Sequence, residues 1–333
     1  MPNVNTPVQE GSLLKVTSSP HVRTEDSIQR IMLDVIIAMV PAIVASCVFF
    51  GFAAISLIAV CVIAAVAAEA LCQKVMGRRV SIDDLSAVVT GILLAFNLPA
   101  GFPLWKAAVG AVFSIVVVKQ LFGGLGSNFM NPALAGRAFL LAQWGKEMTA
   151  TPLPFKADTL SGPTPLAAIK AIQGGAASGD VVVPSLMDLF LGKVPGMLGE
   201  VSAAALLLGA IYLLIRGVIQ LRIPLAYIGS FAVFTFIFGM INGTNGLGDI
   251  PYQILSGGLI LGAFFMATDY ASSPVTSKGQ LIFGLGAGFL TALIRNFGGY
   301  PEGVSYAILL MNVATPLIDK FVKNKTFGRV KDE

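Results

Sequence analysis

Residues 31–50 read IMLDVIIAMVPAIVASCVFF, and Asp34 is the one charged side chain in this run. A helix needs about 20 apolar residues to cross the hydrocarbon core of a bilayer. Over all 333 residues the chain is 55% hydrophobic and 12% charged, whereas soluble domains carry about 25% charged residues. So few polar side chains cannot cover a water-soluble globule, and the sequence therefore predicts an integral membrane protein.

Apolar segments recur along the whole chain and predict an all-α polytopic membrane protein with about ten transmembrane helices. The ten segments are residues 31–50, 53–75, 84–98, 104–122, 132–145, 196–216, 223–241, 252–268, 279–296 and 304–322. The third and fifth are short, and both adjoin proline, in NLPAGFP and NPA. Non-helical backbone at membrane depth is tolerated where protein buries it or a wet cavity receives it. Short broken helices therefore point to a binding site.

The distribution of Lys and Arg predicts the orientation. With ten spans, 15 of the 22 basic residues fall on the side of the N-terminus, six fall on the other side, and Arg137 falls within a span. Cytoplasmic loops are enriched in Lys and Arg, so both termini are expected in the cytoplasm. The predicted parts are a cytoplasmic tail (1–30), a first half of five spans (31–145), an outer-face loop (146–195), a second half of five spans (196–322) and a basic cytoplasmic tail (323–333).

The chain also shows signs of an internal duplication. The blocks GILLAFNLP and FGGLGSNFMNPALAGRAFL resemble GLILGAFFMATD and FGGYPEGVSYAILLM, and the two Phe-Gly-Gly triplets begin at positions 122 and 297. Five spans per repeat would place the halves in opposite orientation, as in the inverted repeats of transporters. Glycine-rich apolar segments can also align by chance, so both interpretations stay open here.

Few residues are available for metal ligation or nucleotide binding. Cys47, Cys61 and Cys72 lie in apolar stretches without a CxxC pair, and His21 is the single histidine. Iron–sulfur clusters usually take four cysteines, so no metal centre is expected within this chain. The net charge of +4 is explained by cytoplasmic loops and does not call for a nucleic-acid partner.

One polar stretch, DTLSGPTPLAA at 158–168, lies in the predicted outer-face loop. Pro163 and Pro165 flank Thr164 and remove two backbone donors, while Gly162 allows a tight turn. The residues alone fit an ordinary polar turn before a short amphipathic helix, or an exposed loop that presents the Thr164 hydroxyl.

This stretch resembles the recognition motif of the periplasmic flavin transferase, which is Asp, two variable residues, Ser or Thr, Gly, Ala and Thr. The matching positions are Asp158, Ser161, Gly162 and Thr164, and Pro163 departs from the motif's alanine. The resemblance implies FMN joined through its phosphate to the Thr164 hydroxyl in a phosphodiester bond, with the flavin transferase as a maturation partner.

Further blocks from about residue 19 to 325 resemble the RnfD/NqrB family of flavin-bearing membrane subunits, and the short N-terminal tail is more similar to RnfD. They include SPHVRTEDSIQRIMLDVIIAMVPA, FFMATDYASSPVTSKG and YPEGVSYAILLMNVATPLID. The resemblance implies a translocase subunit in the bacterial inner membrane, within the Rnf complex. That complex passes electrons between ferredoxin and NAD and moves Na⁺ or H⁺. Partner subunits of the Rnf C, G, A, E and B types would then supply the nicotinamide and iron–sulfur sites.

The same resemblance implies a second, non-covalent flavin such as riboflavin, held by Asn128 and Asn131 in NFMNPALAGRAF. The simpler interpretation is that Asn131 caps the helix that begins at Pro132.

Ionisable residues within the spans form another set of candidates, because charged groups inside a bilayer are costly and usually functional. Glu69, Asp269 and Asp319 are expected near the cytoplasmic ends of spans, as a cation path or as interfacial residues paired with Lys74, Lys278 or Lys320; Asp34 is a weaker candidate. Arg137 and Arg295 are expected to pair with a carboxylate or a flavin phosphate, and Glu200 to cap the sixth span.

The sequence therefore favours an FMN-bearing membrane subunit of a redox-driven ion pump, without a complete active site of its own. One alternative is an NqrB-type subunit of a Na⁺-translocating NADH:quinone reductase. The other is a secondary transporter without redox function, which has no reason to carry the motif at 158–164.

Overall fold

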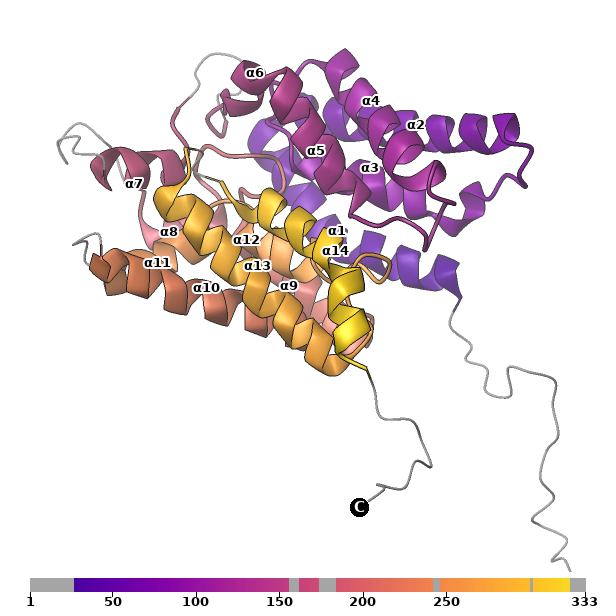
Figure 1. Cartoon of the computed structure of the whole chain (residues 1–333). Helices are drawn as coiled ribbons and strands as arrows, with labels where there is room; N and C mark the ends of the chain where they lie inside the picture. The colour runs from indigo at the N-terminus through magenta and orange to yellow at the C-terminus, as the bar shows by residue number, and fades with distance from the viewer. Residues whose placement is uncertain (1–26, 156–161, 174–183, 242–245, 300–301, 324–333) are drawn as a thin grey trace, which may run out of the picture.

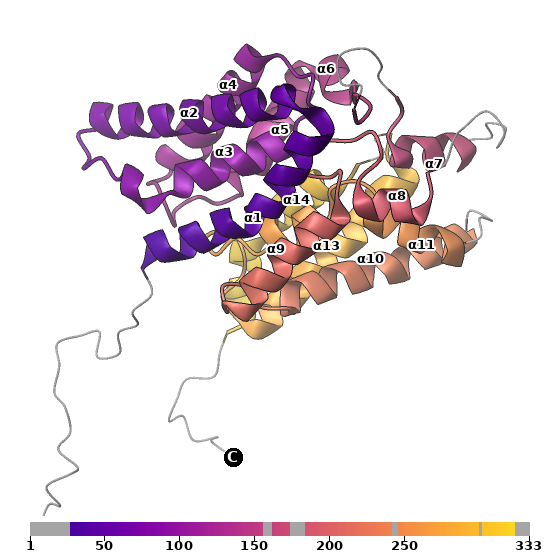
Figure 2. The same cartoon turned by 180° about the vertical axis from the view of Figure 1, so that it is seen from behind.

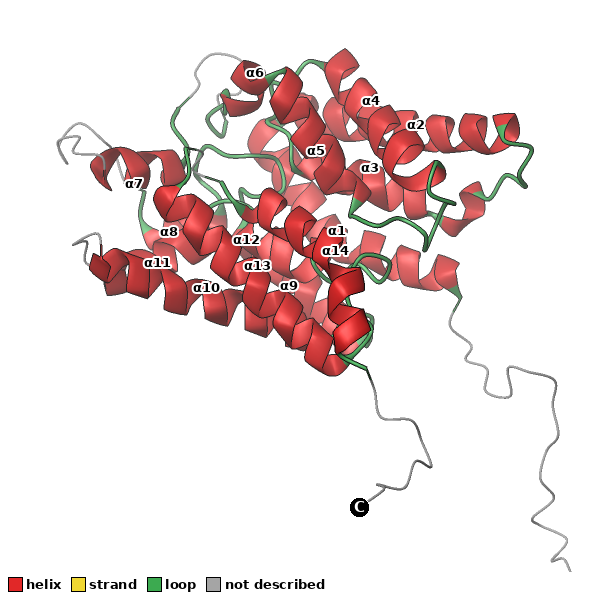
Figure 3. Cartoon of the chain, viewed as in Figure 1, coloured by secondary structure: helices red, strands yellow, loops and turns green. Residues whose placement is uncertain are grey.

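The computed structural model describes residues 27–155, 162–173, 184–241, 246–299 and 302–323. The helices and loops of this part are coloured in Figure 3, and its regular structure is helical. Within these described residues, five helices are long and apolar enough to cross a bilayer. They are α1 (Ile28–Phe50), α2 (Phe52–Val75), α10 (Arg222–Ile241), α13 (Ser277–Phe297) and α14 (Val304–Phe321).

Shorter helices occupy the other predicted segments. They are α3 (Ser86–Phe96), α4 (Leu104–Phe113) continued by the π-helix η2 (Ser114–Gln120), α5 (Pro132–Gln143), α9 (Ala203–Ile215), and α11 (Gly246–Leu255) followed by α12 (Leu259–Leu261) and the π-helix η3 (Gly262–Met266). Every predicted segment thus contains helix, and α3 and α5 are short as expected. Small elements connect them: η1 (Ile82–Asp84), α6 (Gly145–Thr149), α7 (Pro165–Gln173) and α8 (Leu186–Leu191).

The eighth predicted segment is not one continuous helix. It breaks at Ser256–Gly258, where Gly257 has a positive φ of 69°. Arg295 of α13 donates hydrogen bonds to the carbonyls of Gln253 and Ser256, which satisfies the end of α11. The break lies in a run of small and apolar residues, so the mean hydropathy along the sequence does not reveal it.

The sixth segment was predicted to begin at 196, but its helix begins at Ala203. The preceding residues lie against the end of α3, where Leu198 N–H donates to Leu98 and Gly199 N–H donates to Phe96. A side chain at position 199 would collide with the Phe96 ring. Close approach to α3 therefore replaces the first two turns of the expected helix.

Corresponding helices of the two halves, α1–α5 and α9–α14, run antiparallel. Near the start of α1, Asp34 pairs with Arg216 at the end of α9, and further along, Ala38 contacts Gly209. Likewise α5 meets α14 through Asn131 with Asn312, and through Arg137 with Ser305. Opposite directions of the first and of the fifth helices agree with the predicted inverted repeat.

The described chain begins and ends at the same end of the bundle, here called the termini end, while α6, α7 and α8 lie toward the other, the loop end (Figures 1 and 2). The first half lies above the second in Figure 1, and α1 packs against α9 between them. An even number of crossings produces this arrangement.

Candidate functional site

The polar stretch is described from Gly162 onward, and it includes Thr164. Thr164 immediately precedes α7, and its Oγ1 accepts a hydrogen bond from the Ala167 N–H at 3.2 Å. The side chain is half-buried, and Thr164 caps the short amphipathic helix α7, which fits the interpretation of a polar turn before that helix. Asp158 and Ser161 lie outside the described residues.

Two residues earlier the chain is held in place by Thr151. The Gly162 N–H donates to the Thr151 carbonyl at 3.0 Å, and the Thr151 hydroxyl donates to the Gly162 carbonyl at 2.7 Å. Thr151 is 1% exposed. These two bonds and the α7 cap fix the backbone on both sides of Thr164.

Thr164 lies on the wall of a cavity, here called the loop-end pocket, with an empty volume of about 720 Å³ including its opening. Apolar side chains of α5, α6 and the segment before α9 form much of the wall, among them Leu141, Met148 and Met197. Arg137 and Tyr306 add polar groups. Ligand pockets are typically about 300–1,000 Å³ with largely apolar walls and a few polar groups.

Arg137 forms the main ionic contacts of this pocket. Its guanidinium donates to the Glu302 carboxylate and the Ser305 hydroxyl, and lies 3.9 Å from Glu200 Oε1. Pairing with a carboxylate was expected, although Glu302 was not foreseen as the partner because it lies in a loop, two residues before α14. Arg295 was also expected to pair with a carboxylate or a flavin phosphate. Its hydrogen bonds go instead to the backbone carbonyls of Gln253 and Ser256.

Glu200 does not cap α9, which corrects the sequence expectation. The capping residue is Ser202, whose hydroxyl accepts from the Ala205 N–H at 3.3 Å. Glu200 is instead buried between Arg137 and the helix break, where Gly258 lies against its carboxylate.

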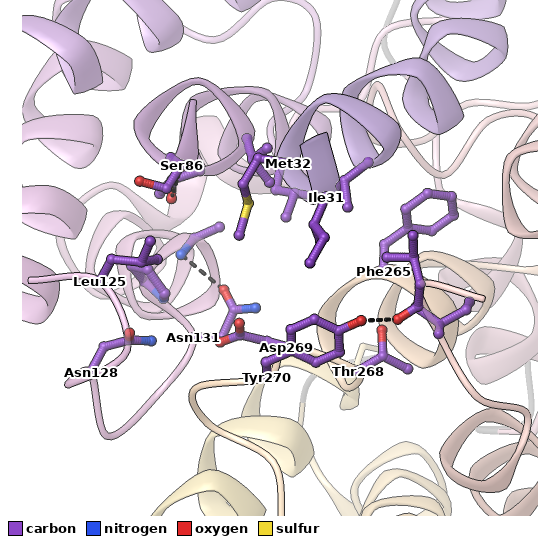
Figure 4. A pocket seen from close by; sticks show the side chains of 18 of the residues that line it. Ile31, Met32, Ser86, Leu125, Asn128, Asn131, Phe265, Thr268, Asp269 and Tyr270 are labelled. Atoms are coloured by element: carbon purple, nitrogen blue, oxygen red, sulfur yellow. Dashed lines mark hydrogen bonds between the residues drawn. The ribbon is translucent and has the colours of Figure 1, made fainter. Parts of the chain in front are cut away.

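A second cavity, the termini-end pocket, lies between α1, α3, α5, α9 and η3 and has an empty volume of about 790 Å³ including its opening. Figure 4 shows Asn128, Asn131 and Asp269 on one side of it, opposite Ile31 and Met32. Lys119 and Ser86 also line this pocket. Residues from both halves therefore meet here.

Asn131 is the cap of α5, as the simpler interpretation held. Its Oδ1 accepts from the N–H groups of Ala133 and Leu134, and its Nδ2 donates to the Met266 carbonyl at 3.3 Å. Asn128 donates to the Met130 carbonyl at 3.1 Å. Both asparagines also line the pocket, so capping and ligand contact are compatible.

The three candidate carboxylates have different surroundings. Asp269 accepts hydrogen bonds from the Ser272 hydroxyl at 2.8 Å and from the Ala271 N–H at 3.5 Å. Asp269 faces the termini-end pocket. Asp319 lies on α14, outside that pocket, and its Oδ1 has no hydrogen-bond partner among the described residues.

Glu69 is 1% exposed and is paired within the protein. Its Oε1 lies 2.8 Å from Lys119 Nζ and accepts from Gln120 Nε2 at 2.7 Å. The prediction that Glu69 pairs with Lys74 was wrong. Its partner, Lys119, lies 50 positions away in the sequence and comes close to Glu69 through helix packing. Asp34, the weaker candidate, pairs with Arg216 at 3.0 Å and accepts from Tyr212 at 2.7 Å.

The chain matches the model of the NQR2, RnfD, RnfE family over residues 15–328. It is 51% identical to the D subunit of the Na⁺-translocating ferredoxin:NAD⁺ oxidoreductase complex of Acetobacterium woodii, covering 96% of each chain. It is 43% identical to the D subunit of the proton-translocating ferredoxin:NAD⁺ oxidoreductase complex of Clostridium ljungdahlii, over 95% of this chain and 97% of the relative. The D subunit of the ion-translocating oxidoreductase complex of Halorhodospira halophila is 33% identical, over 95% and 96%.

Proposed function

The chain belongs to the NQR2, RnfD, RnfE family, and from this premise we propose that it is the D subunit of an ion-translocating ferredoxin:NAD oxidoreductase complex, carrying FMN on Thr164. Near-complete coverage of two ferredoxin:NAD complex subunits supports this assignment over the NADH:quinone reductase alternative. The flavin motif separates it from a transporter without redox function. As one subunit of a translocase, the chain relays electrons between partners.

The surroundings of Thr164 fit a flavin nucleotide. The Oγ1 atom accepts one bond from Ala167, so its proton can be replaced by the phosphoryl group of FMN without breaking that contact. The apolar wall suits an aromatic ring, and Arg137 provides positive charge within the same pocket. When bound, FMN supplies one-electron transfer, and the protein places and tunes it.

The termini-end pocket is the proposed place of a second flavin, held without a covalent bond. Asn128 provides an amide, Asn131 fixes the start of α5, and Val89, Leu93 and Phe265 provide apolar surface. Asp269 on the same wall, with Glu69 and Asp319 nearer the ends of α2 and α14, is proposed for the cation path. Asp269 is the best placed, because its carboxylate faces the cavity whereas Glu69 is held by Lys119.

The proposed setting is the bacterial inner membrane, with the termini end in the cytoplasm and Thr164 on the outer face. The excess of Lys and Arg near the termini supports this orientation. A flavin transferase on the outer side would then reach Thr164, and the Rnf C, G, A, E and B subunits would exchange electrons and ions with this chain.

Thr164→Val tests the proposal most directly, because it keeps the shape of the side chain and removes the acceptor oxygen. Cells that contain the flavin transferase should yield wild-type protein with a fluorescent band in denaturing gels and the mass of FMN on the Thr164 peptide. Thr164→Val should lose both. Thr149→Val is the matched control, since Thr149 lines the same pocket, and should keep both. Flavin on another peptide, or none in wild-type protein, would refute the assignment.

A further inference from the structure

Four charged side chains gather between the two halves at the loop end. Arg137 comes from α5, Arg295 from α13, Glu200 from the segment before α9 and Glu302 from the turn before α14. The side chains of Arg137, Glu200 and Glu302 are 5%, 4% and 16% exposed. This group is separate from Glu69, Asp269 and Asp319, which lie toward the termini end.

The two carboxyl groups of this cluster share one arginine nitrogen. Glu302 contacts Arg137 Nη2 directly, and Glu200 Oε1 lies 3.9 Å from the same nitrogen, without a hydrogen-bond partner among the described residues. Two ionised carboxylates that share one buried site repel strongly, and one of them is normally neutral.

The arginine contacts decide which carboxyl group holds the charge. Arg137 donates a hydrogen bond directly to Glu302, and Glu302 is also the more exposed of the two. Glu200 Oε1 is 3.9 Å from Arg137, which is beyond hydrogen-bonding distance. Arg295 donates to the carbonyls of Gln253 and Ser256. Glu302 therefore has the better stabilised negative charge, and Glu200 is left with the proton.

Other titratable groups near the cluster do not supply a second negative charge. Tyr227 lies near Arg295 but is hydrogen-bonded to Thr291 at 2.7 Å. Tyr306 lies near Arg137 on the wall of the loop-end pocket. Among the described residues, the charged groups acting on Glu200 are Glu302, Arg137 and Arg295.

A route for proton exchange leads from Glu200 toward Thr164. A narrow cavity is lined by Glu200 and Glu302 at one side, by Ser256 and Gly257 of the helix break at another, and by Thr164. Thr164 is half-buried and so reaches the surface. Interrupted helices are where membrane transport proteins commonly place ion sites, because the unwound backbone lines a cavity.

We propose that Glu200 is a proton-binding site between the two halves, which is neutral at physiological pH beside the charged Glu302 and exchanges its proton at the loop end. Within this cluster the two arginines then face one negative charge, which leaves a net charge of +1. A phosphodiester at Thr164 would balance it. This last consequence rests on the proposed FMN attachment, whereas the protonation of Glu200 does not.

Infrared difference spectroscopy of the full-length protein, titrated from neutral to alkaline pH, tests the site. Wild-type protein should show a carbonyl band of a neutral carboxylic acid at neutral pH, shifted in D₂O and lost at alkaline pH. Glu200→Gln should remove it. Glu302→Gln should also remove it, because Glu200 then ionises opposite Arg137. Glu147→Gln, at an exposed carboxylate paired with Lys106, should leave the band unchanged.

A second measurement covers the case in which Glu200→Gln does not fold. A hydrophobic carbodiimide adds to neutral, buried carboxylic acids and forms a stable N-acylurea. Mass spectrometry of wild-type protein should find this adduct on Glu200 at neutral pH, with several-fold less in Glu302→Gln. Thr164→Val should keep both the band and the adduct, which separates this proposal from the flavin assignment. A band that persists in folded Glu200→Gln, or a wild-type protein without band and adduct, overturns the proposal.

Discussion

The second and fourth helices lie side by side in each half, but different chemistry joins them. In the first half, α2 meets the end of the fourth helix through the buried pair of Glu69 and Lys119. In the second half, α10 and α13 approach closely at Gly284 and Gly288. The same backbone plan is therefore stabilised by an ion pair in one half and by small residues in the other.

Lys119 and Arg295 make the comparison more specific. Each is a buried basic residue two or three positions before a Phe-Gly-Gly triplet, at the end of the fourth helix of its half. Lys119 pairs with a carboxylate beside the termini-end pocket, whereas Arg295 binds backbone carbonyls at the helix break. Because the two halves are antiparallel, Lys119 lies near the termini end and Arg295 near the loop end. Lys119 has a carboxylate as its partner, whereas Arg295 has the carbonyls that the helix break exposes.

Glu69→Gln should have the largest effect on stability. It leaves the Lys119 charge buried without a carboxylate, and breaking a buried ion pair typically costs about 3–5 kcal/mol. The free energy of unfolding in mixed micelles, followed by circular dichroism during an SDS titration, measures the loss. The double variant Glu69→Met with Lys119→Met removes both charges and should be more stable than Glu69→Gln. A single variant as stable as wild type would show that the ion pair does not stabilise the first half.

Arg295→Met should have the next largest effect. It removes the charged donor shared by the Gln253 and Ser256 carbonyls, and this loss should cost about 1.5–3 kcal/mol. Faster hydrogen exchange should appear at the end of α11 and at the start of α12. Arg222→Met is the control, since Arg222 is exposed and, within the described part of the chain, bonds to Gln220 and Ser277. Equal exchange in both variants would contradict a role of Arg295 in holding the break.

Gly288→Ala tests the close approach in the second half. A Cβ at this position would collide with the Tyr227 carbonyl and the Ser230 hydroxyl and lie 2.7 Å from the Phe231 nitrogen. Overpacking of this kind costs about 1–3 kcal/mol. At Gly286 a Cβ meets the end of the flexible Met311 side chain, so Gly286→Ala should cost less. Thermal unfolding of both variants in one detergent compares them, and a larger loss at position 286 would be the contrary result.

Hydropathy predicted the helices well because the bilayer fixes the length of a span. It missed the break at Ser256–Gly258, since a glycine pair among apolar residues does not change mean hydropathy. A linear motif identified Thr164 as a candidate, but its capping of α7 depends on backbone geometry. The partners of Glu69 and Arg137 lie 50 and 165 positions away, so only the packing of helices brings them together.

Tyr227→Phe should have the smallest effect of the four, and it tests the polar contact that accompanies the glycine packing of α10 and α13. The Thr291 hydroxyl already donates to the Ala287 carbonyl at 2.8 Å, so the Tyr227 hydroxyl is the donor in their 2.7 Å contact. Removing that donor leaves Thr291 still bonded, and the expected cost is about 1 kcal/mol, that of one hydrogen bond.

Thr291→Val should cost more, about 1–3 kcal/mol, because it leaves the buried Tyr227 hydroxyl without an acceptor. The double variant should lose less than the sum of the two, since both remove the same contact. Strictly additive losses in SDS titrations would show that the two hydroxyls do not interact, and the second half would then be held at this position by shape alone.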